Sequence, residues 1–228
     1  TLAIACALGL VEGFGQPTAF ESFWCPAVQI PPLPTEISQL HPGHVSLVMA
    51  MGDGITAGTF AAGFITESRE LSFSIGDGFG AAAGATLPTI LRRFTNFTMT
   101  GHPLEGASLY EEVSKNASGL PFGDYQPLTD RLNFAETDAG VLSGSLDEQG
   151  ANLTSALSQY QDVASRWKVL TFFMGTHDSC DKCDMPLEDD FLGDYVDRVT
   201  RLFQNIAAHP NMTKTYVNVV PLLNLSYI

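Results

Sequence analysis

The sequence predicts an α/β fold, a three-layer sandwich in which helices cover both faces of a central, mainly parallel sheet. Two nearly uninterrupted apolar runs, at residues 45–51 and 168–175, are typical of strands that are buried on both faces. Residues 187–209 carry apolar side chains at helical spacing and separate the second run from a third strand-like run at 215–223. Strands that alternate with helices favour a parallel sheet with helical crossovers.

Shorter elements are predicted between these strands. A glycine-rich turn at 52–58 leads into a short helix, and residues 87–94 form a helix that tolerates Pro88 in its first turn. Residues 131–135 are predicted to form a short strand, and residues 150–166 carry a helical apolar stripe. Ligands of such sheets bind at the carboxyl ends of the strands, so we expect any site beside residues 52–58, 135–140 and 175–183.

The chain of 228 residues is predicted to hold one domain at residues 45–228, preceded by an extended, proline-rich segment at 16–44. Residues 1–15 resemble the remnant of a secretory signal peptide, because an apolar run is followed by small residues. A buried terminal strand or helix is the alternative for that run. The strand at 215–223 lies five residues before the end. We therefore expect a last loop and helix of the domain beyond residue 228.

Charge and sequons point to an extracellular protein. Apolar residues make up 45% of the chain, enough for a core, while 25 acidic and 11 basic residues give a net charge of −14. Such a chain repels phosphate backbones, so nucleic acid is not an expected partner, and no apolar run reaches the roughly 20 residues that span a bilayer. Secretion or residence in the lumen of the secretory pathway fits the sequons. Five sequons occur, and the four predicted glycosylation sites are Asn96, Asn116, Asn152 and Asn211. The fifth, at Asn224, lies in or beside the last predicted strand, where it would be a poor acceptor.

The pair Cys180-Asp-Lys-Cys183 allows three interpretations. A zinc half-site would need a second ligand pair, and a thioredoxin-type redox site would need its own fold; the sequence offers neither. A local disulfide in an oxidising compartment is the prediction that remains. Cys6 would leave with the signal peptide, and Cys25 would then need a partner outside these residues.

Residues 48–58 contain Gly52-Asp53-Gly54-Ile55-Thr56-Ala57-Gly58 after a predicted buried strand. This segment resembles the first block of the GDSL (SGNH) hydrolases, Gly-Asp-Ser-Leu-Thr-x-Gly, and the wider chain resembles their phospholipase-B branch. Further blocks occur in the order of that branch, before this segment at residues 31–35 and 40–42 and after it at 72–76, 86–91, 132–135 and 175–180, with Cys183 matching the next cysteine. The resemblance implies an SGNH-like, flavodoxin-like sheet.

The resemblance also implies ester hydrolysis by a serine that a histidine activates, with a glycine and an asparagine in the oxyanion hole. In this chain the serine position holds Gly54, next to the retained Asp53. The oxyanion glycine falls on Asp138, unless the loop shifts by two to Gly140, and the oxyanion asparagine falls on His177. The final Asp-x-x-His block has no counterpart here. Without the serine no acyl-enzyme forms.

Three hypotheses follow for function. The first is a degenerate hydrolase that still binds a phospholipid or another lipid ester and needs no cofactor. The second is an active phospholipase or esterase represented by an incomplete or erroneous sequence, which would explain Gly54 but not the other two replacements. The third, ranked last, is a metal or acid–base site formed by Asp53, Asp138 and His177, because carboxylates and imidazole together form a ligand set.

Overall fold

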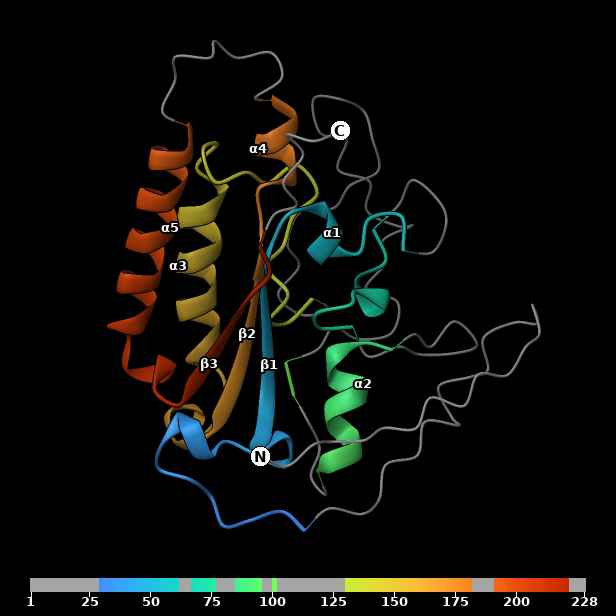
Figure 1. The fold of residues 1–228 in the computed structure, drawn as a ribbon, viewed down its shortest axis with the longest axis vertical. Helices are drawn as coiled ribbons and strands as arrows, with labels where there is room; N and C mark the ends of the chain where they lie inside the picture. The colour runs from blue at the N-terminus through green and yellow to red at the C-terminus, as the bar shows by residue number, and fades with distance from the viewer. Residues whose placement is uncertain are drawn as a thin grey trace, which may run out of the picture.

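The computed structural model describes residues 29–61, 67–76, 85–95, 100–101, 130–181 and 191–221. Its centre is a three-stranded parallel sheet with the order β1-β2-β3 (Figure 1). The strands are β1 (Val45–Gly52), β2 (Trp167–Phe173) and β3 (Thr215–Val219). They confirm the three strands predicted from the apolar runs, although β3 ends earlier than expected. The expected strand at 131–135 is reduced to a single bridge between Asn133 and Ala50 of β1.

Helices cover both faces of the sheet, which confirms the three-layer α/β sandwich. In Figure 1, α3 and α5 lie on one side of the strands and α2 lies on the other, while α1 and α4 follow the carboxyl ends of β1 and β2. The α-helices are α1 (Gly54–Ala57), α2 (Leu87–Leu91), α3 (Ser145–Leu157), α4 (Thr176–Asp181) and α5 (Phe191–Ala207). Short 3₁₀ turns complete the described part, at Ile37–Gln39, Pro42–His44, Arg69–Leu71, Arg92–Phe94, Val163–Ser165 and Pro210–Met212.

Helix α3 begins and ends earlier than the apolar stripe predicts. Asp147 and Glu148 lie in its first turn, where negative charge is favoured by the helix dipole. Gly144 precedes it with φ 96°, a conformation that glycine adopts without strain. The helix buries Leu146, Leu153 and other side chains against the sheet.

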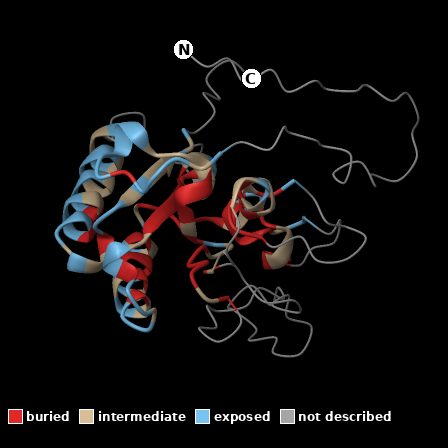
Figure 2. Ribbon diagram, turned by 90° about the horizontal axis from the view of Figure 1, so that it is seen from below, coloured by how far each residue is buried: buried red, intermediate tan, exposed pale blue. Residues whose placement is uncertain are grey.

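The core lies along the strands. Leu47, Met49 and Met51 of β1 and Leu170 of β2 are fully buried, and Figure 2 shows buried residues through the centre and exposed residues on the outer helical layer. Lys168 of β2 is also buried, and its Nζ donates to the carbonyls of Val163 (2.6 Å) and Arg166 (2.8 Å). Burial, with the neighbouring positive charges, lowers the pKa of this lysine to about 8.

Two further findings concern membrane-spanning helices and the first residues of the chain. Across the described ranges, no helix combines the length and apolar character that a bilayer crossing requires. Residues 1–28, on which the predicted signal remnant, Cys6 and Cys25 fall, lie outside the described residues.

Candidate functional site

The carboxyl end of β1 turns directly into α1, and Asp53 fixes this turn. Asp53 is fully buried; one carboxylate oxygen accepts from the backbone N–H of Ile55 (3.3 Å) and so caps α1. The other oxygen accepts from the N–H of Gly175 (3.1 Å), the N–H of Thr176 (2.9 Å) and the Thr176 hydroxyl (2.5 Å). The carboxylate therefore ties the turn after β1 to the connection between β2 and α4, and because it is fully buried it presents no oxygen at the surface.

Gln149, on helix α3, fixes the same turn. This side chain of α3 is fully buried; its Oε1 accepts from the N–H of Gly52 (2.9 Å) and its Nε2 donates to the Gly52 carbonyl (2.9 Å). Thr56 of α1 adds a hydrogen bond from its hydroxyl to the Phe173 carbonyl (3.0 Å). Gln149 was not predicted from the sequence, since nothing there distinguishes it from a surface glutamine of an amphipathic helix.

A cavity of about 250 Å³ opens beside this turn. It brings together two of the predicted site residues, Gly54 at the start of α1 and His177 on α4. Ile55 and Phe60 line it as well, and they are 49% and 58% exposed, which is high for large apolar side chains. The remaining lining residues are Thr59, Thr137, Thr176 and Cys180.

Gly54 leaves room for a small side chain. A β-carbon built on its backbone would lie 3.1 Å from Thr59 Oγ1 and 3.2 Å from the Thr137 carbonyl oxygen. These contacts are tight but need shifts of only a few tenths of an ångström. As built, the position supplies no side-chain oxygen to attack a carbonyl.

The predicted oxyanion positions on the loop before α3 lie differently. Asp138 is exposed and is not among the residues that line the cavity. Gly140 is buried against Asp178, whose Oδ1 would lie 3.0 Å from a β-carbon on Gly140. The two Asp178 oxygens accept from the backbone N–H groups of Val141 (2.8 Å) and Leu142 (2.9 Å).

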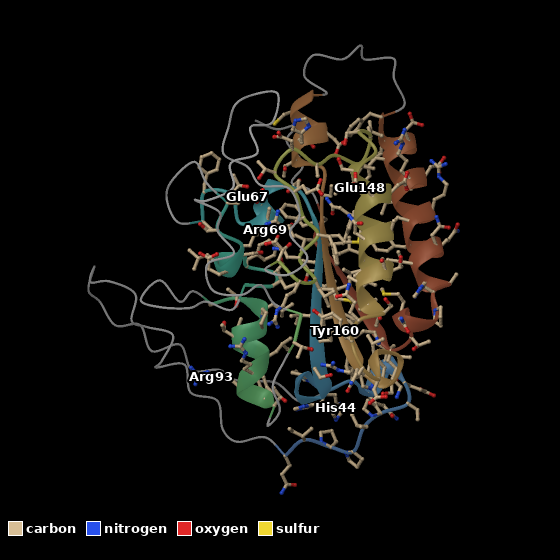
Figure 3. All side chains as sticks on the ribbon, turned by 180° about the vertical axis from the view of Figure 1, so that it is seen from behind. His44, Glu67, Arg69, Arg93, Glu148 and Tyr160 are labelled. Atoms are coloured by element: carbon tan, nitrogen blue, oxygen red, sulfur yellow. The ribbon has the colours of Figure 1, made fainter. Side chains whose placement is uncertain are left out.

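A buried ionic cluster supports the cavity from the side of β1 away from α3. Arg69 is 1% exposed; its guanidinium lies 3.0 Å from Glu67 and 3.4 Å from Asp130, and it donates to the carbonyls of Asn133 (3.1 Å) and Ala135 (2.7 Å). Figure 3 shows Glu67 and Arg69 close together, across β1 from Glu148 of α3. The cluster holds the backbone that leads toward residues 137–140, and the sequence alone did not predict it.

Two hydroxyls connect this cluster to the cavity. The Thr137 hydroxyl donates a short hydrogen bond to the Glu67 carboxylate, and its oxygen lies 2.8 Å from Thr59 Oγ1. An antiparallel bridge joins Thr59 to Glu67. Gly58 permits this approach: its φ is 83°, and a β-carbon there would lie 2.4 Å from the Ser68 carbonyl oxygen.

Tyr195 of α5 lies near the negative groups of this end of the sheet. Burial, together with the charges of Asp178 and Asp53, raises the pKa of its phenol to about 12. The neutral hydroxyl donates to the Met174 carbonyl (2.7 Å) just after β2. Tyr195 therefore holds α5 against the sheet and stays uncharged at neutral pH.

The structure does not assemble the alternative metal site. Within the described ranges, no group of three or more His, Cys, Asp and Glu side chains is arranged to hold a metal ion. Asp53 is turned toward backbone N–H groups, and Asp138 does not share the cavity with His177. The hypothesis of a site formed by these three residues is therefore not supported.

The predicted modifications are only partly placed. Cys180 is exposed on α4, while Cys183 lies outside the described residues, so the disulfide stays a prediction. Asn152 on α3 and Asn211 in the turn Pro210–Met212 are both half-buried. Asn96 and Asn116 also lie outside the described residues.

Comparison with known proteins finds three relatives described as "Phospholipase B1, membrane-associated". The Mus musculus protein is 28% identical over 160 residues, which are 66% of this chain and 10% of the relative. The Rattus norvegicus protein is 27% identical over 161 residues, or 67% and 10%. The Homo sapiens protein is 25% identical over 201 residues, or 85% and 12%.

The chain thus spans about a tenth of the length of these relatives. No family model matches it, and no solved structure matches it. The relatives support a phospholipase-like family of lipid hydrolases for this chain.

Proposed function

We propose that this chain is a phospholipase-B-like member of the GDSL (SGNH) hydrolases that binds a lipid ester without cleaving it by a serine mechanism. The observation that carries the proposal is Gly54, which occupies the position after Asp53 and borders the cavity without a side chain. Acyl transfer needs a nucleophile positioned against an oxyanion hole, and a glycine cannot supply one.

Binding is supported by the lining of the cavity. Ile55 and Phe60 offer apolar surface to an acyl chain, while His177 and the threonine oxygens add polar groups beside it. Such a mixture of apolar surface with a few polar groups is typical of small-molecule sites. A phospholipid is the ligand that the relatives favour.

The same proposal places the protein outside the cell or in the lumen of the secretory pathway. The apolar run at residues 1–11, the sequons and the pair Cys180 and Cys183 support this location. Analysis of the intact mass before and after glycosidase treatment tests it: a loss of hexose-containing mass is expected after expression in animal cells.

The function is tested with lysophosphatidylcholine below its micelle concentration. Equilibrium dialysis should show saturable binding to the full chain, and a fatty-acid assay should show no release. Ile55→Arg places a charge on the apolar lining and should weaken binding about tenfold, the loss expected from about 1.4 kcal/mol of apolar contact. Leu192→Arg is the matched control, because Leu192 lies on α5 and is 68% exposed.

Two outcomes would contradict the proposal. Absence of saturable binding would remove the binding function. Release of fatty acid by the wild-type chain would instead favour an active esterase with another nucleophile. The variant Gly54→Ser restores a hydroxyl at this position, where the structure nearly accommodates a β-carbon, and the same dialysis and fatty-acid assays are applied to it.

A further inference from the structure

A chain of hydrogen bonds runs from the buried ionic cluster to the cavity. It begins at Glu67, which is 6% exposed and pairs with Arg69 at 3.0 Å. It continues through the Thr137 hydroxyl, which donates to Glu67, and ends at Thr59, whose Oγ1 lies 2.8 Å from Thr137 Oγ1. Only the last two residues line the cavity.

The direction of donation along these hydrogen bonds is fixed at the buried end, by Glu67. A carboxylate paired with a guanidinium is ionised and can only accept hydrogen bonds. Thr137 has one hydroxyl hydrogen, and it is used on Glu67. In the bond between the two threonines, Thr59 must therefore be the donor. Its hydrogen is then engaged, and toward a ligand Thr59 Oγ1 can act only as an acceptor.

The Thr59 oxygen also borders the space that a glycine leaves open. A β-carbon on Gly54 would lie 3.1 Å from it, so the oxygen sits next to the position at which the family's serine would stand. Thr59 is a poor substitute nucleophile, because the Glu67 carboxylate reaches it only through Thr137. Its chemistry suits binding.

We propose that Thr59, oriented by Thr137 and Glu67, makes the cavity select lipid esters that carry a free hydroxyl beside the ester group. This inference rests on the proposed function, the binding of a lipid ester. A free hydroxyl can donate a hydrogen bond to the Thr59 oxygen. An ether oxygen at the same place is only an acceptor, so it forms no hydrogen bond with Thr59, and the two oxygens repel each other. Thr59 and Thr137 are thus specificity-determining residues.

The test compares monooctanoylglycerol with its di-O-methyl ether, both below their micelle concentrations, by titration calorimetry of the full chain. The two probes share the acyl chain and ester, and the ether carries a methyl group in place of each hydroxyl hydrogen, so it has no hydrogen-bond donor. One hydrogen bond of about 1 kcal/mol predicts about fivefold tighter binding of the hydroxylated probe. Thr59→Val should bring this ratio to about one, while Thr200→Val, at an exposed position of α5, should leave it unchanged.

The variant Thr137→Val tests whether Thr137 sets the direction of the Thr59 hydroxyl or only packs beside it. It frees the Thr59 hydrogen, so Thr59 can donate, and the ether should bind more tightly than it does to the wild type. Thr137→Ser keeps the hydroxyl and should restore the selectivity.

The ratio of the two probes' affinities for the wild type tests the proposal even where a variant fails to fold. Equal binding of both probes overturns the selectivity and leaves lipid binding standing. Binding of neither probe overturns the proposed function and this inference with it. An unchanged ratio in a folded Thr59→Val variant assigns the selectivity to another group and also overturns the inference.

Discussion

Replacing Gln149 by leucine is expected to destabilise the protein by about 1–3 kcal/mol, the cost of leaving one buried donor without a partner. Gln149 is fully buried and binds both the N–H and the carbonyl of Gly52 at 2.9 Å. The carbonyl also accepts from the N–H of Glu136 (3.2 Å), so it keeps a partner in the variant. The N–H of Gly52 loses the side chain that accepts from it, and this loss sets the magnitude.

For the variant Gln149→Glu, the structure predicts the direction in which stability changes with pH. An ionised carboxylate can accept from the Gly52 N–H, but its second oxygen would face the Gly52 carbonyl and repel it. Burial and this repulsion raise the pKa of the new carboxyl above the value of about 4.3 that it has in the unfolded chain. The folded variant therefore binds the proton more tightly. The contribution of this carboxyl to stability is therefore fully present below about pH 4.3 and is lost as the pH rises through the raised pKa.

Urea unfolding, followed by tryptophan fluorescence and by far-UV circular dichroism at several pH values, measures both effects. Gln204→Leu and Gln204→Glu are matched controls on the exposed side of α5. The reasoning is refuted if Gln149→Leu unfolds within about 0.5 kcal/mol of its control, the range of an ordinary surface substitution. It is equally refuted if the two glutamate variants show the same dependence on pH.

Three further predictions concern stability. Arg69→Met leaves two buried carboxylates without their cation and should cost about 3–5 kcal/mol in urea unfolding; a loss below about 1 kcal/mol would show that the cluster is not coupled. Lys168 has a pKa of about 8 in the folded chain, below its unfolded value of 10.5, so the unfolded state binds more protons between them and the wild type should gain stability as pH rises through this window. The difference in unfolding free energy between the wild type and Lys168→Met measures this gain, and a flat difference contradicts it. Gly58→Ala and Gly144→Ala both force an alanine into positive φ, at about 1–2 kcal/mol. Gly58→Ala should lower the Tm further, because its β-carbon would lie 2.4 Å from the Ser68 carbonyl oxygen while that of Gly144 meets nothing within 4 Å; equal Tm losses would contradict the contact.

The strands could be predicted from the sequence because burial on both faces leaves an unbroken apolar run. The segment 131–135 was predicted as a strand, and it does pair with β1 around Ala50, whose N–H donates to the Leu132 carbonyl (2.9 Å) and whose carbonyl accepts from the Phe134 N–H (2.9 Å). A regular parallel ladder would continue with a bond from the Gly52 N–H to the Phe134 carbonyl, but the Gln149 side chain takes that N–H. A sequence pattern does not contain this competition.

The site was predictable where a residue belongs to a local block and not where it acts across the fold. Gly54 and His177 were identified from short blocks, and both line the cavity. Gln149 reaches Gly52 across 97 residues, and Arg69 reaches Asn133 across 64. Such partners are set by tertiary packing, so a single sequence gives no spacing by which to find them.

The contacts of Asp53 also bear on how such a chain can change over time. Its carboxylate holds the turn after β1 and the start of α4 together through backbone N–H groups and Thr176, without help from any side chain at Gly54. The fold therefore depends on Asp53 whether or not the site carries a nucleophile. Glycine and serine codons can differ by one nucleotide. A lineage could lose or regain the hydroxyl at this position by single mutations while every intermediate protein still folds.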